Sequence, residues 1–358
     1  MKFLALGREY SGLQERRSDI IMKISVICKT EFIRKNLMEN LKNIRDGKNR
    51  TRTSLSISEV LDHPGADTAI VFPEKGEELP DAGSLKAERI IWVFNKGDER
   101  YEELYGTPLN KRSLIYRSPS VTGKWDDSDS ILPVLCRAAA EDLPYPETDT
   151  TRKYEVLFIE DMAEELLNAI EGRPHRDSEG YCCFPDTFSF APGEAMDLLN
   201  GFKRLNSTLV IPPEPKGSLS YRLFSMYLSF LPERKMIYPV KMNPDNRGVF
   251  SELIKTKDNG QVSINIARPG ITRGQHWHNS KWEIFIVVSG HGLIQERKIG
   301  TDEVISFEVR GEDMRAVIML PGYTHSITNL EKDRDLVTIM YANESFDPER
   351  PDTYFEEV

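Results

Sequence analysis

The second half of the chain is a succession of short β-rich segments separated by glycine, aspartate and asparagine. The predicted strands are residues 249–254, 262–266, 282–288, 292–298, 303–309, 317–320 and 336–341. Strands that are this short and this closely spaced pair antiparallel and close into a sandwich or a barrel. We therefore expect an all-β domain over residues 235–358.

The first half has the pattern of an α/β domain. Its predicted strands are residues 22–28, 69–72, 89–94 and 113–117, and its predicted helices are residues 31–44, 161–170 and 193–205. The strands are apolar throughout and alternate with helices, which is typical of a parallel sheet covered on both faces. A proline-rich stretch over 206–216 and a helix over 218–231 lead to the second domain. The expected organisation is an extension over 1–21, an α/β domain over 22–234 and the all-β domain.

Charge and composition exclude several classes of protein. The 358 residues carry a formal net charge of −10, so the chain lacks the basic surface of a nucleic-acid-binding protein. No apolar stretch is long enough to be a signal-peptide core or a membrane span. The four cysteines, Cys28, Cys136, Cys182 and Cys183, form no C-x-x-C pair. Reduced thiols and a cytoplasmic location are expected, with no nucleic acid and no membrane as partners.

Three histidines and one glutamate stand in a pattern that predicts a metal site. Residues two positions apart on a β-strand point to the same face of the sheet. His276 and His278 therefore share a face if they lie on one strand. Glu283 opens the next strand, and His325 follows in a separate Pro-Gly-Tyr-Thr-His segment. Three imidazoles and a carboxylate suit a divalent transition metal, with zinc as the first expectation.

These two segments resemble both motifs of the cupin superfamily. The glycines Gly270 and Gly290 flank the first motif, and Gly322 and Asn329 belong to the second. One position departs from the pattern, since Met319 stands where the proline is expected. The resemblance implies a cupin double-stranded β-helix, so the predicted fold class is α/β plus all-β.

Further motifs narrow the resemblance. The segments D-N-R-G-V-F-S-E (245–252) and R-G-Q-H (273–276) are similar to signatures of the 3,5-epimerases of dTDP-4-keto sugars. Residues 343–358, and the region from Tyr238 onward, resemble the bifunctional capsular-polysaccharide enzyme of the UDP-N-acetyl-L-fucosamine route. In that family a cupin epimerises a UDP-4-keto-6-deoxy-N-acetylhexosamine at C3, and a short-chain dehydrogenase domain reduces the 4-keto group with NADPH.

The resemblance also implies roles for individual residues. Arg247, Arg273 and Lys281 are candidates for binding the diphosphate of a UDP-sugar. The base of the metal-free epimerases is the histidine of R-G-x-H, which here is the expected metal ligand His276, and a ligated imidazole takes no proton. The acid–base role then falls to other candidates, which are Glu344, Tyr341 and Tyr323.

The α/β domain departs from the family where a dinucleotide would bind. The first strand–helix turn reads C-K-T-E-F-I-R (28–34) and lacks the glycines that let backbone N–H groups approach a pyrophosphate. Tyr105 resembles the catalytic tyrosine, but Leu109 stands in place of its lysine. We therefore expect a degenerate Rossmann-like domain that binds no NADP and has lost reductase activity.

The sequence thus predicts a metal-dependent nucleotide-sugar epimerase of capsule or surface polysaccharide synthesis. The alternative is a non-catalytic protein that binds a nucleotide sugar or acts as a scaffold in the same pathway. Residues 282–288 are apolar at both alternating positions, so both faces of that strand require burial, either against a second copy of the chain or against the first domain. The resemblance favours the second copy, so a homodimer is expected.

Overall fold

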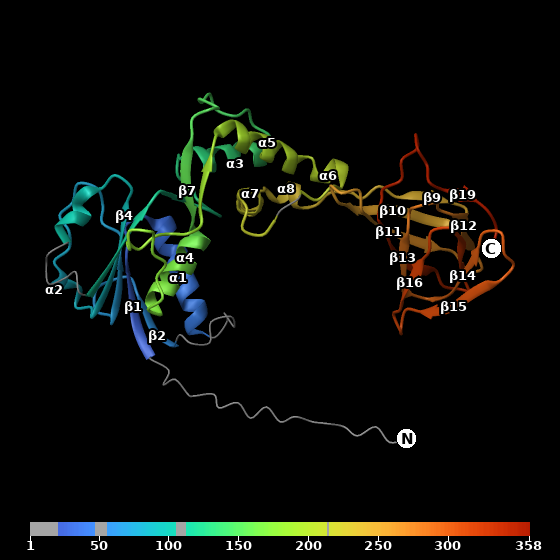
Figure 1. Ribbon diagram of the computed structural model, residues 1–358, viewed down its shortest axis with the longest axis horizontal. Helices are drawn as coiled ribbons and strands as arrows, with labels where there is room; N and C mark the ends of the chain where they lie inside the picture. Colours follow the sequence, from blue (N-terminus) through green and yellow to red (C-terminus); the bar gives the residue numbers. More distant parts are fainter. Residues whose placement is uncertain (1–20, 47–55, 105–111, 213–214) are drawn as a thin grey trace, which may run out of the picture. The chain divides into compact units, whose positions relative to one another are not determined.

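A computed structural model describes residues 21–46, 56–104, 112–212 and 215–358 (Figure 1). The described chain forms two compact units, one of residues up to 136 together with 146–195, and one of residues 137–145 together with 196–358. The extension predicted over 1–21 lies outside the described residues except for Ile21, where the first strand begins. The Tyr105–Leu109 comparison also falls outside them.

The first unit is built on a parallel five-stranded sheet with the order β2-β1-β3-β4-β5. Its strands are β1 (Ile21–Ile27), β2 (Ser56–Leu61), β3 (Thr68–Val71), β4 (Arg89–Asn95) and β5 (Ser113–Ser118). All four residues of β3 and the five central residues of β4 are buried, as expected for strands covered on both faces. This order is a doubly wound topology, which confirms the predicted Rossmann-like class.

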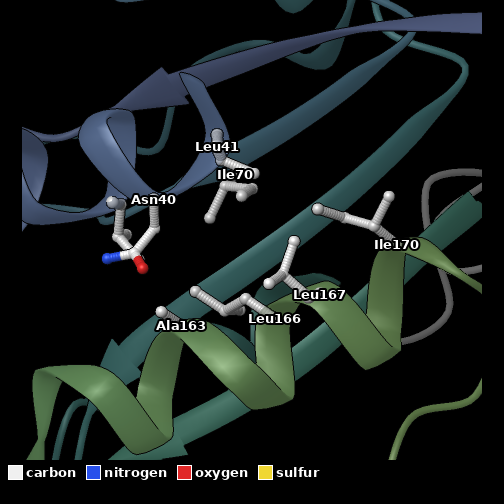
Figure 2. A pocket seen from close by; sticks show the side chains of 8 residues that line it. Asn40, Leu41, Ile70, Ala163, Leu166, Leu167 and Ile170 are labelled. Atoms are coloured by element: carbon white, nitrogen blue, oxygen red, sulfur yellow. The ribbon is translucent and has the colours of Figure 1, made fainter. Parts of the chain in front are cut away.

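Helices cover both faces of this sheet. On one face α1 (Glu31–Arg45) and α4 (Ile159–Ile170) share an apolar core with β1 and β2. On the other face the core includes α2 (Ala82–Leu85) and residues of the 3-10 helix Glu99–Leu104. A cavity of about 10 Å³ lies between α1 and α4 (Figure 2) and is lined by leucine, isoleucine and alanine side chains besides Asn40. It is no larger than one water molecule needs, so it is a packing defect.

Some elements between the parallel sheet and the second domain were not predicted. A small sheet joins β6 (Ser120–Thr122), β7 (Tyr154–Phe158) and β8 (Thr187–Phe190), and α3 spans Ile131–Glu141. The helices α6 (Leu205–Thr208) and α8 (Glu233–Met236) were also not predicted, whereas α5 (Pro192–Lys203) and α7 (Leu219–Ser229) confirm the helices predicted over 193–205 and 218–231. The stretch predicted as a linker therefore contains a short helix, and the division at residue 235 remains a prediction.

The second unit contains two antiparallel sheets that form the predicted cupin. One has the order β16-β13-β18-β11-β10-β9 and the other the order β15-β14-β17-β12-β19. The strands are β9 (Asn243–Asp245), β10 (Gly248–Lys255), β11 (Gln261–Ala267), β12 (Thr272–Trp277), β13 (Glu283–Ser289), β14 (His291–Lys298), β15 (Val304–Arg310), β16 (Ala316–Met319), β17 (Tyr323–Asn329), β18 (Leu336–Ala342) and β19 (Tyr354–Phe355).

The cupin core lies between its two sheets. Phe285 and Val287 of β13 pack with Ile294 of β14 and Ile327 of β17. Since alternate residues of a strand face opposite sides, Glu283 shares the inward face of β13 with Phe285, and His325 shares the inward face of β17 with Ile327. The two sheets thus carry a carboxylate and an imidazole toward the same interior.

Among the described residues, no helix is long and apolar enough to cross a membrane. The four cysteines are free thiols, and three of them are buried.

Candidate metal centre

Local backbone geometry places the first two histidines. In β12 a bulge between Gly274 and His276 interrupts the pairing with β17, and Gln275 has a φ of +61°. At Gly274 a side chain would approach the carbonyl oxygen of His325 to 2.7 Å, so the R-G-x-H segment needs a glycine there. His276 then pairs with His325, and His278 follows just beyond the end of β12.

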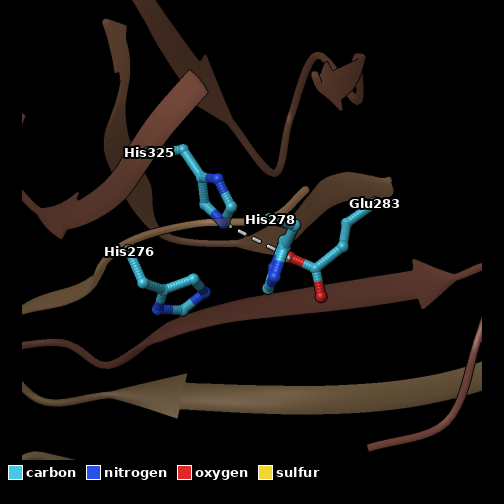
Figure 3. A group of neighbouring side chains, drawn as sticks. All are labelled: His276, His278, Glu283 and His325. Carbon is cyan, nitrogen blue, oxygen red and sulfur yellow. Dashed lines mark ion pairs between the residues drawn. The ribbon is translucent and has the colours of Figure 1, made fainter. Parts of the chain in front are cut away.

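Four side chains converge at this point (Figure 3). One possible ligand atom from each of His276, His278, Glu283 and His325 lies within 4.8 Å of those of the others. Oε2 of Glu283 is 3.5 Å from Nε2 of His278 and 3.3 Å from Nε2 of His325. The structure therefore brings together all four residues that the sequence predicted as metal ligands.

The unpaired atoms of the cluster fit a metal. Nε2 of His278 and Nε2 of His325 are buried and make no hydrogen bond to any described residue. Nδ1 of His278 lies 2.5 Å from the carbonyl oxygen of Asp352, and Nδ1 of His325 lies 3.4 Å from that of Tyr323. A carbonyl oxygen only accepts, so each Nδ1 carries the hydrogen and each Nε2 presents a lone pair to the cluster. Two buried lone pairs beside a carboxylate would be costly without a cation between them.

The electrostatics keep two of the candidate ligands in their metal-binding forms. Burial, together with the neighbouring imidazoles of His325 and His278, lowers the pKa of His276 to about 4. Burial alone would raise the pKa of Glu283, but the adjacent imidazoles and Lys281 hold it well below its ordinary value. At neutral pH His276 is therefore a neutral imidazole and Glu283 an ionised carboxylate, the protonation states that a divalent ion requires.

The three cations predicted to bind substrate have different surroundings. Nζ of Lys281 lies 3.5 Å from Oε1 of Glu283, and its side chain is mostly buried. Arg273 pairs with the inward-facing Ile327 and reaches to 3.4 Å from Asp245. Arg247 is half exposed and bonds to the same carboxylate, 2.7 Å away. Lys281 is thus beside the cluster, whereas Arg247 lies in the β9–β10 turn.

The three acid–base candidates also differ in position. Tyr323 stands two residues before His325 on β17 and so shares its inward face. Tyr341 pairs with Ile284, which places its side chain on the face of β13 and β18 opposite to Glu283. Its ring packs on Trp282 with centroids 5.5 Å apart. Glu344 follows the end of β18, two residues beyond the partner of Glu283.

Sequence reasoning missed two carboxylates near the centre. Glu296 of β14 is buried and pairs with His325, and burial raises its pKa. Asp352 accepts hydrogen bonds from the turn between His278 and Glu283. The alternation of residues along β14 could have shown that Glu296 faces the interior. No pattern in the residues around Asp352 indicated its role.

Among the residues that the structure describes, no such cluster lies at the carboxyl edge of the parallel sheet. In a doubly wound sheet a dinucleotide binds where the strand order reverses, here between β1 and β3. Lys29 follows β1 and Glu77 lies in the loop after β3, and Nζ of Lys29 is 2.5 and 2.7 Å from the two carboxylate oxygens. An ion pair therefore bridges this crevice.

Known proteins resemble this chain along both units. The polysaccharide biosynthesis C-terminal domain family matches residues 243–354. A UDP-2-acetamido-2,6-beta-L-arabino-hexul-4-ose reductase of Pseudomonas aeruginosa is 33% identical over 264 residues, which are 73% of this chain and 70% of the relative. The capsular polysaccharide assembling protein CapF from Staphylococcus aureus is 34% identical with a TM-score of 0.78, covering 94% of this chain and 99% of that one. A CapF crystal structure with the inhibitor 3-isopropenyl-tropolone gives 34% identity and a TM-score of 0.80, over 94% of this chain and all of that chain.

Proposed function

Because this chain belongs to the bifunctional epimerase/reductase family of capsular-polysaccharide biosynthesis, we propose that it epimerises C3 of a UDP-4-keto-6-deoxy-N-acetylhexosamine in its cupin. The observation that supports the proposal most directly is the inward-facing cluster of three histidines and Glu283 with Lys281 beside it. A site that gathers metal ligands and a cation suits an anionic substrate with a ketone.

The chemistry asks for three functions. A C3 proton next to a ketone is removed by a base, the enolate oxygen is stabilised, and a proton returns from the other face. A divalent ion held by His276, His278, Glu283 and His325 would supply the electrophile for the enolate oxygen when bound. We propose zinc as that ion, since a set of nitrogen ligands and one carboxylate suits it.

The chain's own residues supply the remaining functions. Lys281 and Arg273 bind the diphosphate. The ammonium group of Lys281 lies beside the cluster, and the guanidinium of Arg273 has N–H donors besides the one that faces Asp245. Tyr323 is the favoured proton-transfer group, since it lies on the inward face with His325. Glu344 is the second candidate. Tyr341 is the third candidate, because its side chain lies on the face of the sheet opposite to Glu283.

In this proposal the first domain does no redox chemistry. The β1–α1 connection contains no glycine, and Glu77 places a negative charge at the crevice that a pyrophosphate would enter. The domain would then serve as a scaffold, and a separate reductase would complete the reaction sequence in the cytoplasm.

Solvent deuterium uptake tests the proposal. The zinc-loaded protein is incubated in D₂O with a UDP-4-keto-6-deoxy-N-acetylhexosamine, and C3 labelling is followed by NMR. We expect labelling in the wild type and an at least about 100-fold slower rate for Glu283→Gln, because transition-state stabilisation is lost. Tyr323→Phe should slow labelling without weakening substrate binding. Binding without any labelling would instead favour the non-catalytic nucleotide-sugar-binding protein.

A further inference from the structure

The segment Asp352–Val358, which we call the strap, runs beside the strand that carries His276. Within it β19 pairs antiparallel with β12 (Figure 1). In this pairing Phe355 lies opposite His276 and Tyr354 lies opposite Trp277. The rings of Trp277 and Tyr354 stack with centroids 4.5 Å apart. The strap is thus an added edge strand next to the metal ligands.

At its beginning the strap holds the turn that separates two ligands. The carboxylate of Asp352 accepts hydrogen bonds from the backbone N–H groups of Asn279 at 2.8 Å, Ser280 at 2.8 Å and Lys281 at 3.0 Å. It also accepts one from the Ser280 hydroxyl at 3.2 Å. Three consecutive residues of the connection from His278 to Glu283 are therefore oriented by one side chain.

The same residue orients a ligand directly. The carbonyl oxygen of Asp352 accepts from Nδ1 of His278, which turns the ring so that Nε2 faces the cluster. An imidazole whose outer nitrogen is held in this way keeps one tautomer and one ring orientation. Asp352 therefore acts on His278 through its backbone and on the following turn through its side chain.

At its end the strap holds the backbone beside His276. The N–H of Glu356 donates to the carbonyl oxygen of Gln275 at 3.1 Å, and the N–H of Val358 donates to Oε1 of Gln275 at 2.8 Å. Gln275 has the left-handed φ of +61°, which is unfavourable for a residue with a side chain unless its surroundings hold it. Arg297 of β14 bonds to Glu356 at 2.9 Å and so ties the strap to the barrel.

From these contacts we propose that the strap is a structural part of the metal centre and that Asp352 is its positioning residue. The inference rests on the metal-binding part of the proposed function, and it adds that two ligands from one segment reach their geometry only when residues 352–358 are docked. Other contacts hold the ends of the segment, since the N–H of Gly322 donates to the carbonyl oxygen of His278 at 2.7 Å and the N–H of Trp282 donates to Oδ1 of Asn343 at 2.9 Å. The strap holds residues 279–281 between them.

The affinity for zinc and the spectrum of the cobalt-substituted protein test this. In the full chain, Asp352→Asn keeps the shape of the side chain but turns an N–H₂ group toward backbone donors. We expect a zinc dissociation constant about 10- to 100-fold higher, measured by competition with a chromogenic chelator. The visible bands of bound Co²⁺ should change, and the amides of residues 279–281 should exchange faster with deuterium.

The matched control is Asp347→Asn, because the carboxylate of Asp347 accepts a hydrogen bond from the N–H of Glu349 within its own turn. It should retain wild-type zinc affinity and spectrum. Gln275→Ala, which removes the acceptor of the Val358 N–H, should weaken zinc binding in the same direction and serves if Asp352→Asn does not fold. Wild-type affinity and an unchanged Co²⁺ spectrum in a folded Asp352→Asn protein would overturn the strap's role alone. A wild type that takes up no metal would overturn both the metal centre and the strap's role in it. Deuterium labelling of the substrate tests the epimerase function in a separate experiment.

Discussion

Nε2 of His325 lies 3.3 Å from Oε2 of Glu283, although the two residues come from different sheets and are 42 positions apart in the sequence. Neither this nitrogen nor Nε2 of His278 has a hydrogen-bond partner among the described residues. The closeness of His325 and Glu283, with these nitrogens unbonded, indicates that a cation would bind between the two sheets.

The first prediction follows from this pair. Purified protein should contain close to one equivalent of zinc per chain, and His278→Ala should lose it. With zinc at 100 times its dissociation constant, the metal adds about 2.7 kcal/mol to the folded state. His278→Ala should therefore lower the melting temperature of the cupin by roughly 5–10 °C. Elemental analysis and calorimetry measure both effects. His291→Ala is the control, since His291 pairs with Glu308 outside the cluster, and metal-free wild type would contradict the prediction.

The second prediction concerns the cofactor. We expect no saturable heat of binding for NADPH or NADH and no ketone-dependent oxidation of NADPH. The reasons are the glycine-free β1–α1 connection and the Lys29–Glu77 ion pair across the crevice. A dehydrogenase of the same fold, titrated in the same buffer, is the positive control. Saturable binding to this chain would show that other backbone groups replace the missing glycines.

The third prediction is a homodimer through the outer face of the six-stranded cupin sheet. Ile339 lies on that face between Ile264 and Ile286, and exposed Ile318 extends the apolar surface. Light scattering should give twice the 41.0 kDa of one chain. Ile339→Glu should shift the protein to monomer, because a buried unpaired charge at an apolar interface is costly. Leu143→Glu changes an exposed leucine of similar size elsewhere and should leave the dimer intact. A monomeric wild type at micromolar concentration would count against the idea.

The fourth prediction uses the thiol of Cys28. Burial raises its pKa from 9.0 to about 11. The unfolded thiol therefore ionises first as the pH rises, and the stability that the protonated thiol contributes is lost between about pH 9 and pH 11. At pH 10 this loss is about 1.4 kcal/mol. Urea unfolding of the wild type and of Cys28→Ala at pH 8 and pH 10 measures this loss. The packing that the alanine variant loses is the same at both pH values, so only the ionisation of Cys28 contributes to the difference. An equal pH effect in both proteins would refute the assignment.

Much of the site was readable from local sequence, because its ligands sit in two short motifs. The spacing of His276, His278 and Glu283 encodes one strand, a turn and the start of another strand. The all-β domain and the parallel sheet were predicted from apolar patterns, and the double-stranded β-helix from the resemblance to cupins. The β12 and β17 strands were not among the predicted strands, since polar residues and a bulge obscure their alternation.

Local sequence is sufficient to identify the candidate metal ligands, the cupin and Rossmann-like classes and the missing glycine turn, because each depends on neighbours within a few residues. Which side chains share a face, and what supports the candidate ligands, depends on the tertiary structure. Pairing of β13 with β18 turns Tyr341 away from Glu283. Asp352 reaches the 279–281 turn from about seventy residues further along the chain. Strand register and the docking of a distant segment are set by packing of the whole domain, so no local pattern encodes them.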